Sequence, residues 1–360
     1  MPAISLFEPY ALGPHKLANR IVMNPMTRCR ADADGVPTPI MATYYAQRAT
    51  AGLIVTEGVA PSANGRGYAR QPGLWSAAQI AAWKPVTAGV KAQGGVIFAQ
   101  IMHTGRVSHA ANMPAGGRII APSALALAGQ MYSDAQGMQD YPVPQEMTLA
   151  DIASTQAEFV TTAKDAIAAG FDGIELHGAN GYLLEQFLSP HTNQRHDAYG
   201  GSVANRIRFV VEVAKAAAAA IGGDKVGIRL SPYGMASGMT PYPEVDETYL
   251  ALTKALAEAG LIYLHIANHA AMGNPPIPAA LLASLHAAWP RTFFLGGSFD
   301  LASGQAAVDA GESDLVGIGR AFIANPDLVA RMKNGTPLAE MNSDALYSAG
   351  AAGYTDYPNA

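Results

Sequence analysis

Short apolar runs recur along the chain, separated by longer segments in which apolar positions follow helical spacing. The runs are nearly continuous rather than alternating, which is typical of parallel strands covered by helices on both faces. Eight runs predict strands, at Ile21–Met26, Leu53–Glu57, Val96–Met102, Gly173–His177, Val226–Ser231, Tyr263–Ala267, Phe293–Gly297 and Leu315–Gly319.

Helices are predicted between these strands, because Ser, Thr or Asp precedes several of the segments and Gly follows most of them. Their ranges are Met41–Thr50, Ala77–Gln93, Ala150–Ala169, Val203–Ile221, Val245–Ala259 and Leu301–Ala310. Eight βα units in order favour an α/β fold of the (β/α)8 TIM-barrel type, as a single domain over residues 1–360 with long βα loops. A doubly wound open sheet is the alternative, but no Gly-x-Gly-x-x-Gly opens a first helix.

Composition and charge narrow the class of protein. Hydrophobic residues make up 49% and charged residues 14%, which excludes a disordered chain. The net charge of −5 and the lack of a basic run argue against binding of nucleic acid. No apolar stretch reaches the roughly 18 residues of a membrane helix, and no secretory signal is evident. Cys29 is the one cysteine, so no internal disulfide forms, and we expect a cytoplasmic protein.

Three polar side chains follow the fourth predicted strand, in the segment His177-Gly-Ala-Asn180-Gly-Tyr182. The carboxyl ends of barrel strands carry the active site of this fold. Imidazole and carboxamide groups can both donate to one oxygen and so stabilise negative charge there. A phenol is protonated at neutral pH and can act as a general acid. A purely structural role in satisfying loop backbone groups is the less favoured interpretation.

Two glycine-containing turns follow the seventh and eighth strands. They contain Gly296, Gly297 and Ser298, and Gly319 and Arg320. Loops at these positions often bind phosphate in this fold, and glycines let backbone N–H groups approach it. Ordinary tight turns remain the alternative for each loop taken alone.

Polar residues also end three other strands, at Thr27, Gln100 and Arg229. Polar groups at the mouth of a barrel need hydrogen-bond partners, and a flat heterocycle with carbonyl and N–H groups would supply them. Arg229 would suit a ring that becomes anionic. The histidines are dispersed and the zinc-protease, nucleophile-elbow and P-loop motifs are absent, so no metal site is expected.

An ordered set of motifs resembles the old yellow enzyme family of FMN-dependent ene-reductases over nearly the whole chain. The matching segments are Asn19-Arg20-Ile21, Pro25-Met26-Thr27-Arg28, Tyr44-Tyr45-Ala46-Gln47-Arg48, His103-Thr104-Gly105-Arg106, His177-Gly-Ala-Asn180-Gly-Tyr182, Thr192-Asn193-Gln194-Arg195, Tyr199-Gly-Gly-Ser202, Asn205-Arg206, Gly319-Arg320, Asn325-Pro326-Asp327 and Gly353-Tyr-Thr-Asp-Tyr-Pro358. Thr27 and the tail are similar to the classical branch, including N-ethylmaleimide reductases.

The resemblance implies tightly bound, non-covalent FMN, with NADPH or NADH as a transient reductant. The implied cofactor-binding residues are Pro25, Met26, Thr27, Ala60, Gln100, Arg229, Gly296, Gly297, Ser298, Gly319 and Arg320. His177 and Asn180 would hold the oxygen of an activated alkene, namely an enone, enal, maleimide or nitroalkene. Tyr182 would protonate its α-carbon after hydride reaches the β-carbon. Tyr68, Met102 and Tyr347 would line the substrate pocket of a monomer or homodimer.

Two departures from the family pattern concern the substrate pocket. Met102 stands where many classical members have Trp, and Leu346 stands where an aromatic residue is common. The loop His269–Pro278 matches no assigned pattern. Other FMN barrel oxidoreductases, such as hydroxyacid oxidases or dihydroorotate dehydrogenases, a flavin-free sugar-phosphate lyase or isomerase, and a non-enzymatic binder remain as alternatives.

Overall fold

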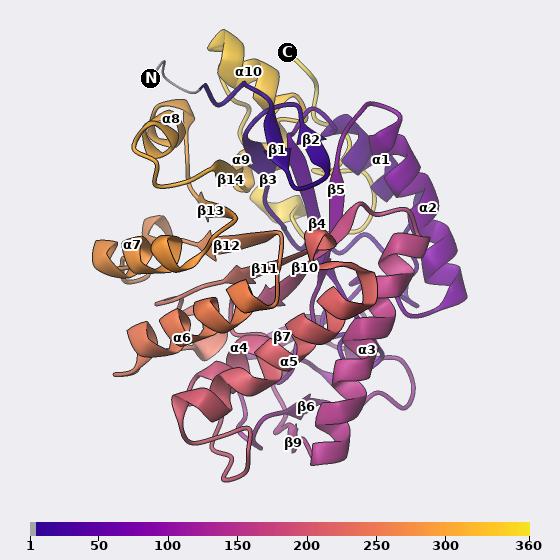
Figure 1. The fold of residues 1–360 in the computed structure, drawn as a ribbon. Coiled ribbons are helices and arrows are strands. Elements are labelled where there is room, and N and C mark those ends of the chain that lie inside the picture. The colour runs from indigo at the N-terminus through magenta and orange to yellow at the C-terminus, as the bar shows by residue number, and fades with distance from the viewer. Residues whose placement is uncertain (1–4) are drawn as a thin grey trace.

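The computed structural model describes residues 5–360 and contains a closed barrel of eight parallel strands (Figure 1). Around the barrel they are β3 (Ile21–Met23), β4 (Leu53–Val59), β5 (Ile97–Ile101), β10 (Gly173–Gly178), β11 (Val226–Leu230), β12 (Tyr263–Ala267), β13 (Thr292–Gly297) and β14 (Leu315–Ile318). Because β14 pairs with β3, the sheet has no open edge. The TIM barrel and all eight predicted strands are confirmed, and the open sheet is excluded.

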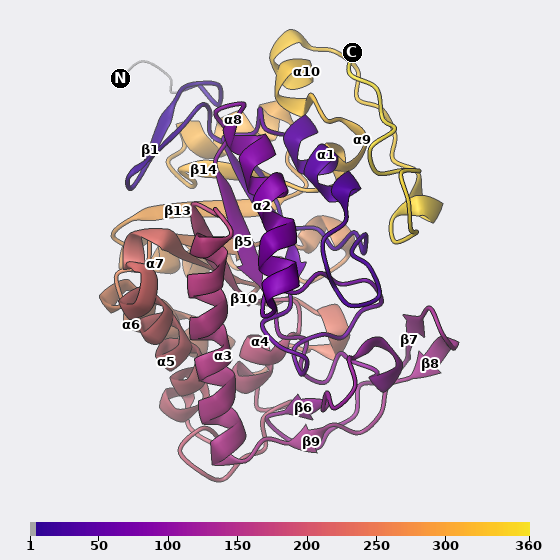
Figure 2. The same cartoon turned by 90° about the vertical axis from the view of Figure 1, so that its right-hand side faces the viewer.

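Helices cover the outside of the barrel (Figures 1 and 2). They are α1 (Pro39–Gln47), α2 (Ala77–Lys91), α3 (Leu149–Ala168), α5 (Val203–Ile221), α6 (Val245–Glu258), α7 (Ala279–Ala288), α8 (Leu301–Asp309) and α10 (Leu328–Asn334). Capping boxes at Ser76, Thr148 and Asp300 fix the starts of α2, α3 and α8. The six predicted helices are confirmed, with ends shifted by up to three residues.

Several elements were not predicted. Helix α7 consists mainly of Ala and Leu, so its apolar positions do not define one face. Helix α4 (Leu183–Leu188) is buried on all sides and therefore lacks a polar stripe, and α9 (Arg320–Ala324) is a short turn after β14. The strands outside the barrel have at most four residues, too few for a period-two pattern: β1 (Tyr10–Leu12), β2 (His15–Leu17), β6 (Ile120–Ala121), β7 (Gln130–Ser133), β8 (Gly137–Asp140) and β9 (Gln145–Glu146).

Two large clusters of buried side chains make up most of the apolar core. The larger part lies between strands and helices and contains Trp83 and Phe159. The smaller part contains Phe98 and Phe294, and Leu12 and Leu17 of the β1–β2 hairpin pack against it. The carboxyl ends of the strands, at the opposite mouth, carry the polar residues discussed below. Within residues 5–360, no helix is both long and apolar enough to span a bilayer.

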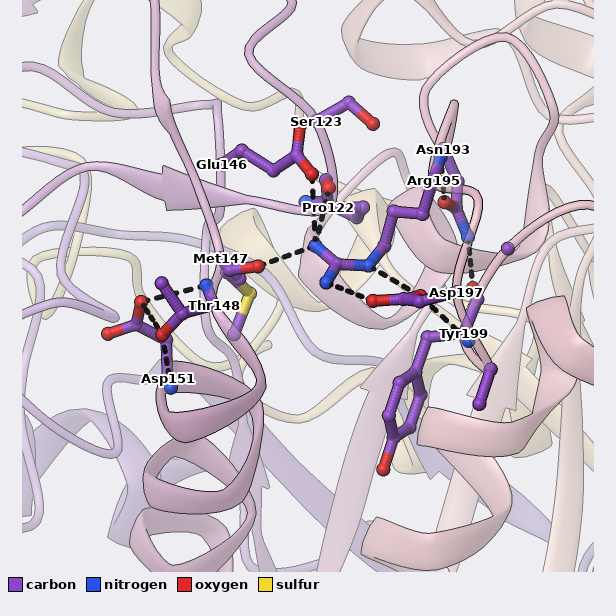
Figure 3. A network of polar contacts seen from close by, with 12 residues as sticks. Pro122, Ser123, Glu146, Met147, Thr148, Asp151, Asn193, Arg195, Asp197 and Tyr199 are labelled. Atoms are coloured by element: carbon purple, nitrogen blue, oxygen red, sulfur yellow. Dashed lines mark hydrogen bonds and ion pairs between the residues drawn. The ribbon is translucent and has the colours of Figure 1, made fainter.

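Arg195 connects the long loops at the carboxyl ends of the barrel strands to one another (Figure 3). Its Nη1 donates to the carbonyl oxygens of Pro122, at 3.0 Å, and Met147, at 2.5 Å. Its Nε and Nη2 donate to the two carboxylate oxygens of Asp197, at 3.1 and 2.6 Å. The side chain is buried, and such bidentate charge-assisted pairs are among the strong polar contacts of proteins. The motif around Arg195 therefore has a structural role in holding the loops after β5 and β10.

Candidate active site

A tight turn after β10 presents Asn180 and Tyr182 next to His177. Asn180 and Gly181 have φ of +60° and +77°, the left-handed region that Asn and Gly tolerate best. A Cβ on Gly181 would lie 2.7 Å from the carbonyl oxygen of Ala236, so only glycine fits. Tyr182 is the residue that precedes α4, and its ring lies 4.9 Å from the His177 ring in a T-shaped arrangement. The turn thus brings the three predicted catalytic residues together.

His177 is a neutral hydrogen-bond donor. Burial lowers its pKa well below the usual value, and the charge of Arg229, its register partner on β11, acts in the same direction. Its Nδ1 accepts the N–H of Ala179 at 3.3 Å. A neutral imidazole has one N–H, so the proton resides on Nε2. His177 therefore offers Nε2–H to a bound oxygen.

Tyr182 is held as a protonated phenol. Its hydroxyl lies 2.8 Å from that of Tyr68. Burial raises the pKa of Tyr182 to about 12, although the hydrogen bond with Tyr68 acts in the opposite direction. Burial also raises the pKa of Tyr68 well above its usual range, and the contact with Tyr182 raises it further. This pattern favours Tyr68 as the donor and leaves the Tyr182 proton available to a substrate.

A cavity of about 750 Å³ is lined by Thr27, Tyr68, Tyr182 and Tyr347 among others, whereas His177 and Asn180 are not among its lining residues. Arg70 ties its walls together, because Nε donates to the Cys29 carbonyl at 3.1 Å and Nη2 to the Tyr347 carbonyl at 2.7 Å. Its Nη1 pairs with Asp134, in the turn between β7 and β8. The β7–β8 hairpin and the C-terminal segment both lie on the right in Figure 2.

A second cavity, of about 330 Å³, is lined by all of the predicted phosphate-loop residues. These are Gly296, Gly297, Ser298, Gly319 and Arg320, joined by Arg229, Asn24, Asn268 and His269. A Cβ atom built on Gly296 would lie 2.3 Å from His265 Nε2, so this position requires glycine, whereas Cβ atoms on Gly297 and Gly319 would make ordinary van der Waals contacts at 3.5 and 3.6 Å. The buried Arg229 Nε and Asn24 Oδ1 lack partners within the described chain. Unpartnered buried polar atoms, and a cation beside glycine backbone that lines a cavity, fit FMN.

The remaining predicted cofactor and pocket residues lie on neighbouring elements. Pro25 and Met26 follow β3, with the Met26 sulfur 3.6 Å from a Cβ built on Gly319. Ala60, which follows β4, forms an isolated parallel β-bridge with Gly73. Met102 is buried over Gly58, in a small apolar cluster with Tyr182.

Sequence reasoning missed a buried polar network beneath the cavities. Glu175 of β10 accepts from Gln100 Nε2 at 2.8 Å, Tyr263 OH at 3.1 Å and His265 Nδ1 at 2.9 Å. The register of the barrel places Glu175 beside Gln100. A glutamate within an apolar strand was the one available signal. The network gives Gln100, a predicted flavin contact, a fixed amide orientation.

Glu185 of α4 was also missed, and it supports the turn that contains Asn180. It accepts from the Gly181 N–H at 2.6 Å, Ser231 OH at 2.7 Å and Tyr249 OH at 2.6 Å. Burial raises the pKa of Glu185 to about 7, although these donors act in the opposite direction.

We predict that Glu185 makes the protein less stable as pH rises. The unfolded carboxyl loses its proton near pH 4.3, whereas the folded one keeps it to about pH 7. The stabilising contribution of Glu185 is therefore complete at low pH and disappears as the pH rises between these two values. The free energy of unfolding falls by about 3 kcal/mol over this range. Melting temperatures at pH 5 and pH 8 should differ more for the unaltered protein than for Glu185→Gln. Glu212→Gln, which also loses a tyrosine-bonded carboxylate, is the control and should keep the parental difference. Equal pH dependence in Glu185→Gln would contradict the prediction.

No group of three or more His, Cys, Asp or Glu side chains in residues 5–360 is placed to hold a metal ion.

The chain matches the model of the NADH:flavin oxidoreductase / NADH oxidase family over residues 5–339. It is 40% identical to a probable flavin mononucleotide-dependent alkene reductase of Leishmania infantum, covering 98% of this chain and 97% of the relative.

Two solved structures match the fold closely. Morphinone reductase superposes with a TM-score of 0.95 at 38% identity, covering 99% of this chain and 97% of that one. The old yellow enzyme homologue from Zymomonas mobilis gives 0.95 at 37% identity, covering 99% and 100%. The chain therefore belongs to the NADH:flavin oxidoreductase / NADH oxidase family as an old yellow enzyme homologue, an oxidoreductase that uses non-covalent FMN with NAD(P)H as reductant.

Proposed function

We propose that this enzyme reduces the carbon–carbon double bond of enones, enals, maleimides and nitroalkenes, with Tyr182 as the proton donor. His177 and Asn180 hold the carbonyl or nitro oxygen of the substrate. FMN, when bound, supplies the hydride that NADPH or NADH provides. The side chains bind and polarise the alkene and deliver the proton, so that hydride at the β-carbon and proton at the α-carbon complete the reduction.

The oxygen site favours the transition state over the free alkene. Negative charge develops on the activating oxygen as hydride adds to the β-carbon. The His177 Nε2–H donates to that oxygen in a water-poor site, where fixed donors stabilise charge more strongly than water does. A second donor from Asn180 completes the pair. The oxygen site therefore activates the substrate as well as orienting it.

The contact between Tyr68 and Tyr182 is the observation that supports Tyr182 as the proton donor. Tyr182 gives its proton to the α-carbon, and the Tyr68 hydroxyl at 2.8 Å then donates to the phenolate that remains. The proton returns to Tyr182 from solvent. Similarity to the Leishmania alkene reductase supports a reductase acting on unsaturated substrates. A second relative, 12-oxophytodienoate reductase 2 of Arabidopsis thaliana, is 36% identical over 99% of this chain and 96% of that protein, and supports the same substrate class.

Anaerobic spectroscopy of the purified protein tests this function. We expect a yellow protein whose visible band bleaches with NADPH or NADH and returns when 2-cyclohexen-1-one is added. The product should be cyclohexanone. Bleaching without return of the band for any of the four alkene classes would refute the proposed substrates but keep the flavoprotein. A protein that takes up no FMN would favour the flavin-free barrel instead.

A further inference from the structure

The loop after β12, which matches no assigned sequence pattern, places His269 against Asn180. The distance from His269 Nε2 to Asn180 Oδ1 is 2.7 Å. We propose that His269 is a positioning residue that turns the Asn180 amide so that its Nδ2 donates to the substrate oxygen. This proposal rests on the function above, and it assigns a role to a residue outside the three-residue cluster that the sequence predicts.

The backbone of Asn180 is already fixed by other contacts. Its N–H donates to Ser231 Oγ at 2.9 Å, and the Ser231 hydroxyl donates to Glu185 at 2.7 Å. The left-handed backbone at Asn180 is followed directly by the left-handed Gly181. The side-chain amide of Asn180 can still rotate by half a turn, which exchanges the positions of its oxygen and nitrogen atoms. The contact with His269 is the one that distinguishes these two orientations.

His269 is neutral and can donate through one ring nitrogen. Burial lowers its pKa to about 4, and the charges of Arg229, His265 and Arg320 act in the same direction. With the proton on Nε2, His269 donates to Asn180 Oδ1, and Nδ2 faces away from His269 as a donor. In the described chain, Nδ2 has no protein acceptor. The reverse orientation would turn Oδ1 toward the substrate oxygen and set two acceptors against each other.

The loop that carries His269 is anchored at several points. The Asn268 N–H donates to the Gly296 carbonyl at 2.7 Å, which continues the pairing of β12 with β13. Asn274 Oδ1 accepts the Met235 N–H, in the loop after β11, at 2.6 Å. The His269 carbonyl accepts from Met272 at 2.8 Å. His269 is therefore held in place independently of Asn180, as a positioning group must be.

The test is a double-mutant cycle in FMN-loaded protein with 4-chlorophenol as the probe. The phenol oxygen takes the place of the substrate oxygen, and flavin difference spectra report its dissociation constant. His269→Phe keeps a ring but removes the N–H, and should weaken binding about tenfold, the value of one net hydrogen bond. His269→Gln places an amide N–H near the position of Nε2 and should bind within about threefold of the parent.

The Asn180→Ala background decides whether His269 acts through Asn180. There, adding His269→Phe should change the dissociation constant less than about twofold, since no amide remains to be oriented. Unchanged binding in His269→Phe alone, or the same tenfold loss in both backgrounds, would overturn the proposal. Cyclohexenone reduction by the unaltered protein tests the proposed function separately. The alkene assay can therefore fail while the binding cycle succeeds, and the reverse.

Discussion

Replacement of Tyr182 with Phe should slow the oxidation of the reduced enzyme by cyclohexenone about 10²–10⁴-fold, the usual contribution of a general acid. Reduction of the bound flavin by NADPH should keep its rate, because no proton from Tyr182 enters that half-reaction. The two rates are measured separately by anaerobic stopped-flow absorbance. Since the pKa of Tyr182 is about 12, the parental alkene half-reaction should show no loss from Tyr182 ionisation between pH 6 and pH 9.

Tyr68→Phe is the matched control for this prediction. It leaves the acid in place but removes the donor 2.8 Å from its oxygen, so the phenolate formed on Tyr182 loses one hydrogen bond. We expect a loss of about tenfold, well below that of Tyr182→Phe. If Tyr182→Phe turned over cyclohexenone at the parental rate, Tyr182 would not be the acid, and the proton would have to come from water or another group.

The barrel, and the gathering of polar side chains at the carboxyl ends of its strands, could be predicted from sequence because the signals are local. Each strand is a compact apolar run, and Tyr263–Ala267 has the predicted bounds. His177, Asn180 and Tyr182 lie within six residues of one another, so one turn brings them together. The first strand ends at Met23 rather than Met26, because Pro25 has no N–H to continue the ladder.

Contacts between distant strands and loops could not be predicted in this way. Glu175, Tyr263 and His265 meet only because the closed barrel aligns β10 with β11 and β11 with β12. His269 reaches Asn180 from 89 positions along the chain, out of an irregular loop with no period. In the first case Glu175 orients Gln100, and in the second His269 is proposed to orient Asn180. The sequence around Glu175 is typical of a buried strand and that around His269 of an irregular loop, so neither stands out.

Removal of the Glu175 carboxylate should have the largest effect on stability. Glu175→Ala leaves the amide of Gln100, the hydroxyl of Tyr263 and the ring N–H of His265 without their acceptor in a site that excludes water. Each unsatisfied buried donor costs about 1–3 kcal/mol, so the three together cost about 3–9 kcal/mol, against a total stability of about 5–15 kcal/mol. For a chain of 360 residues the melting temperature should therefore fall by at least about 4 °C.

The same substitution should also weaken FMN binding, because Gln100 loses the contact that orients its amide. Glu175→Gln is the matched control. It fills about the same volume and keeps an acceptor oxygen, so its melting temperature and its FMN affinity should both stay closer to the parent than those of Glu175→Ala. Melting curves of apoprotein and fluorescence titration with FMN measure each quantity. Parental stability and FMN affinity in Glu175→Ala would show that the three donors find other partners, and that Gln100 is held without Glu175.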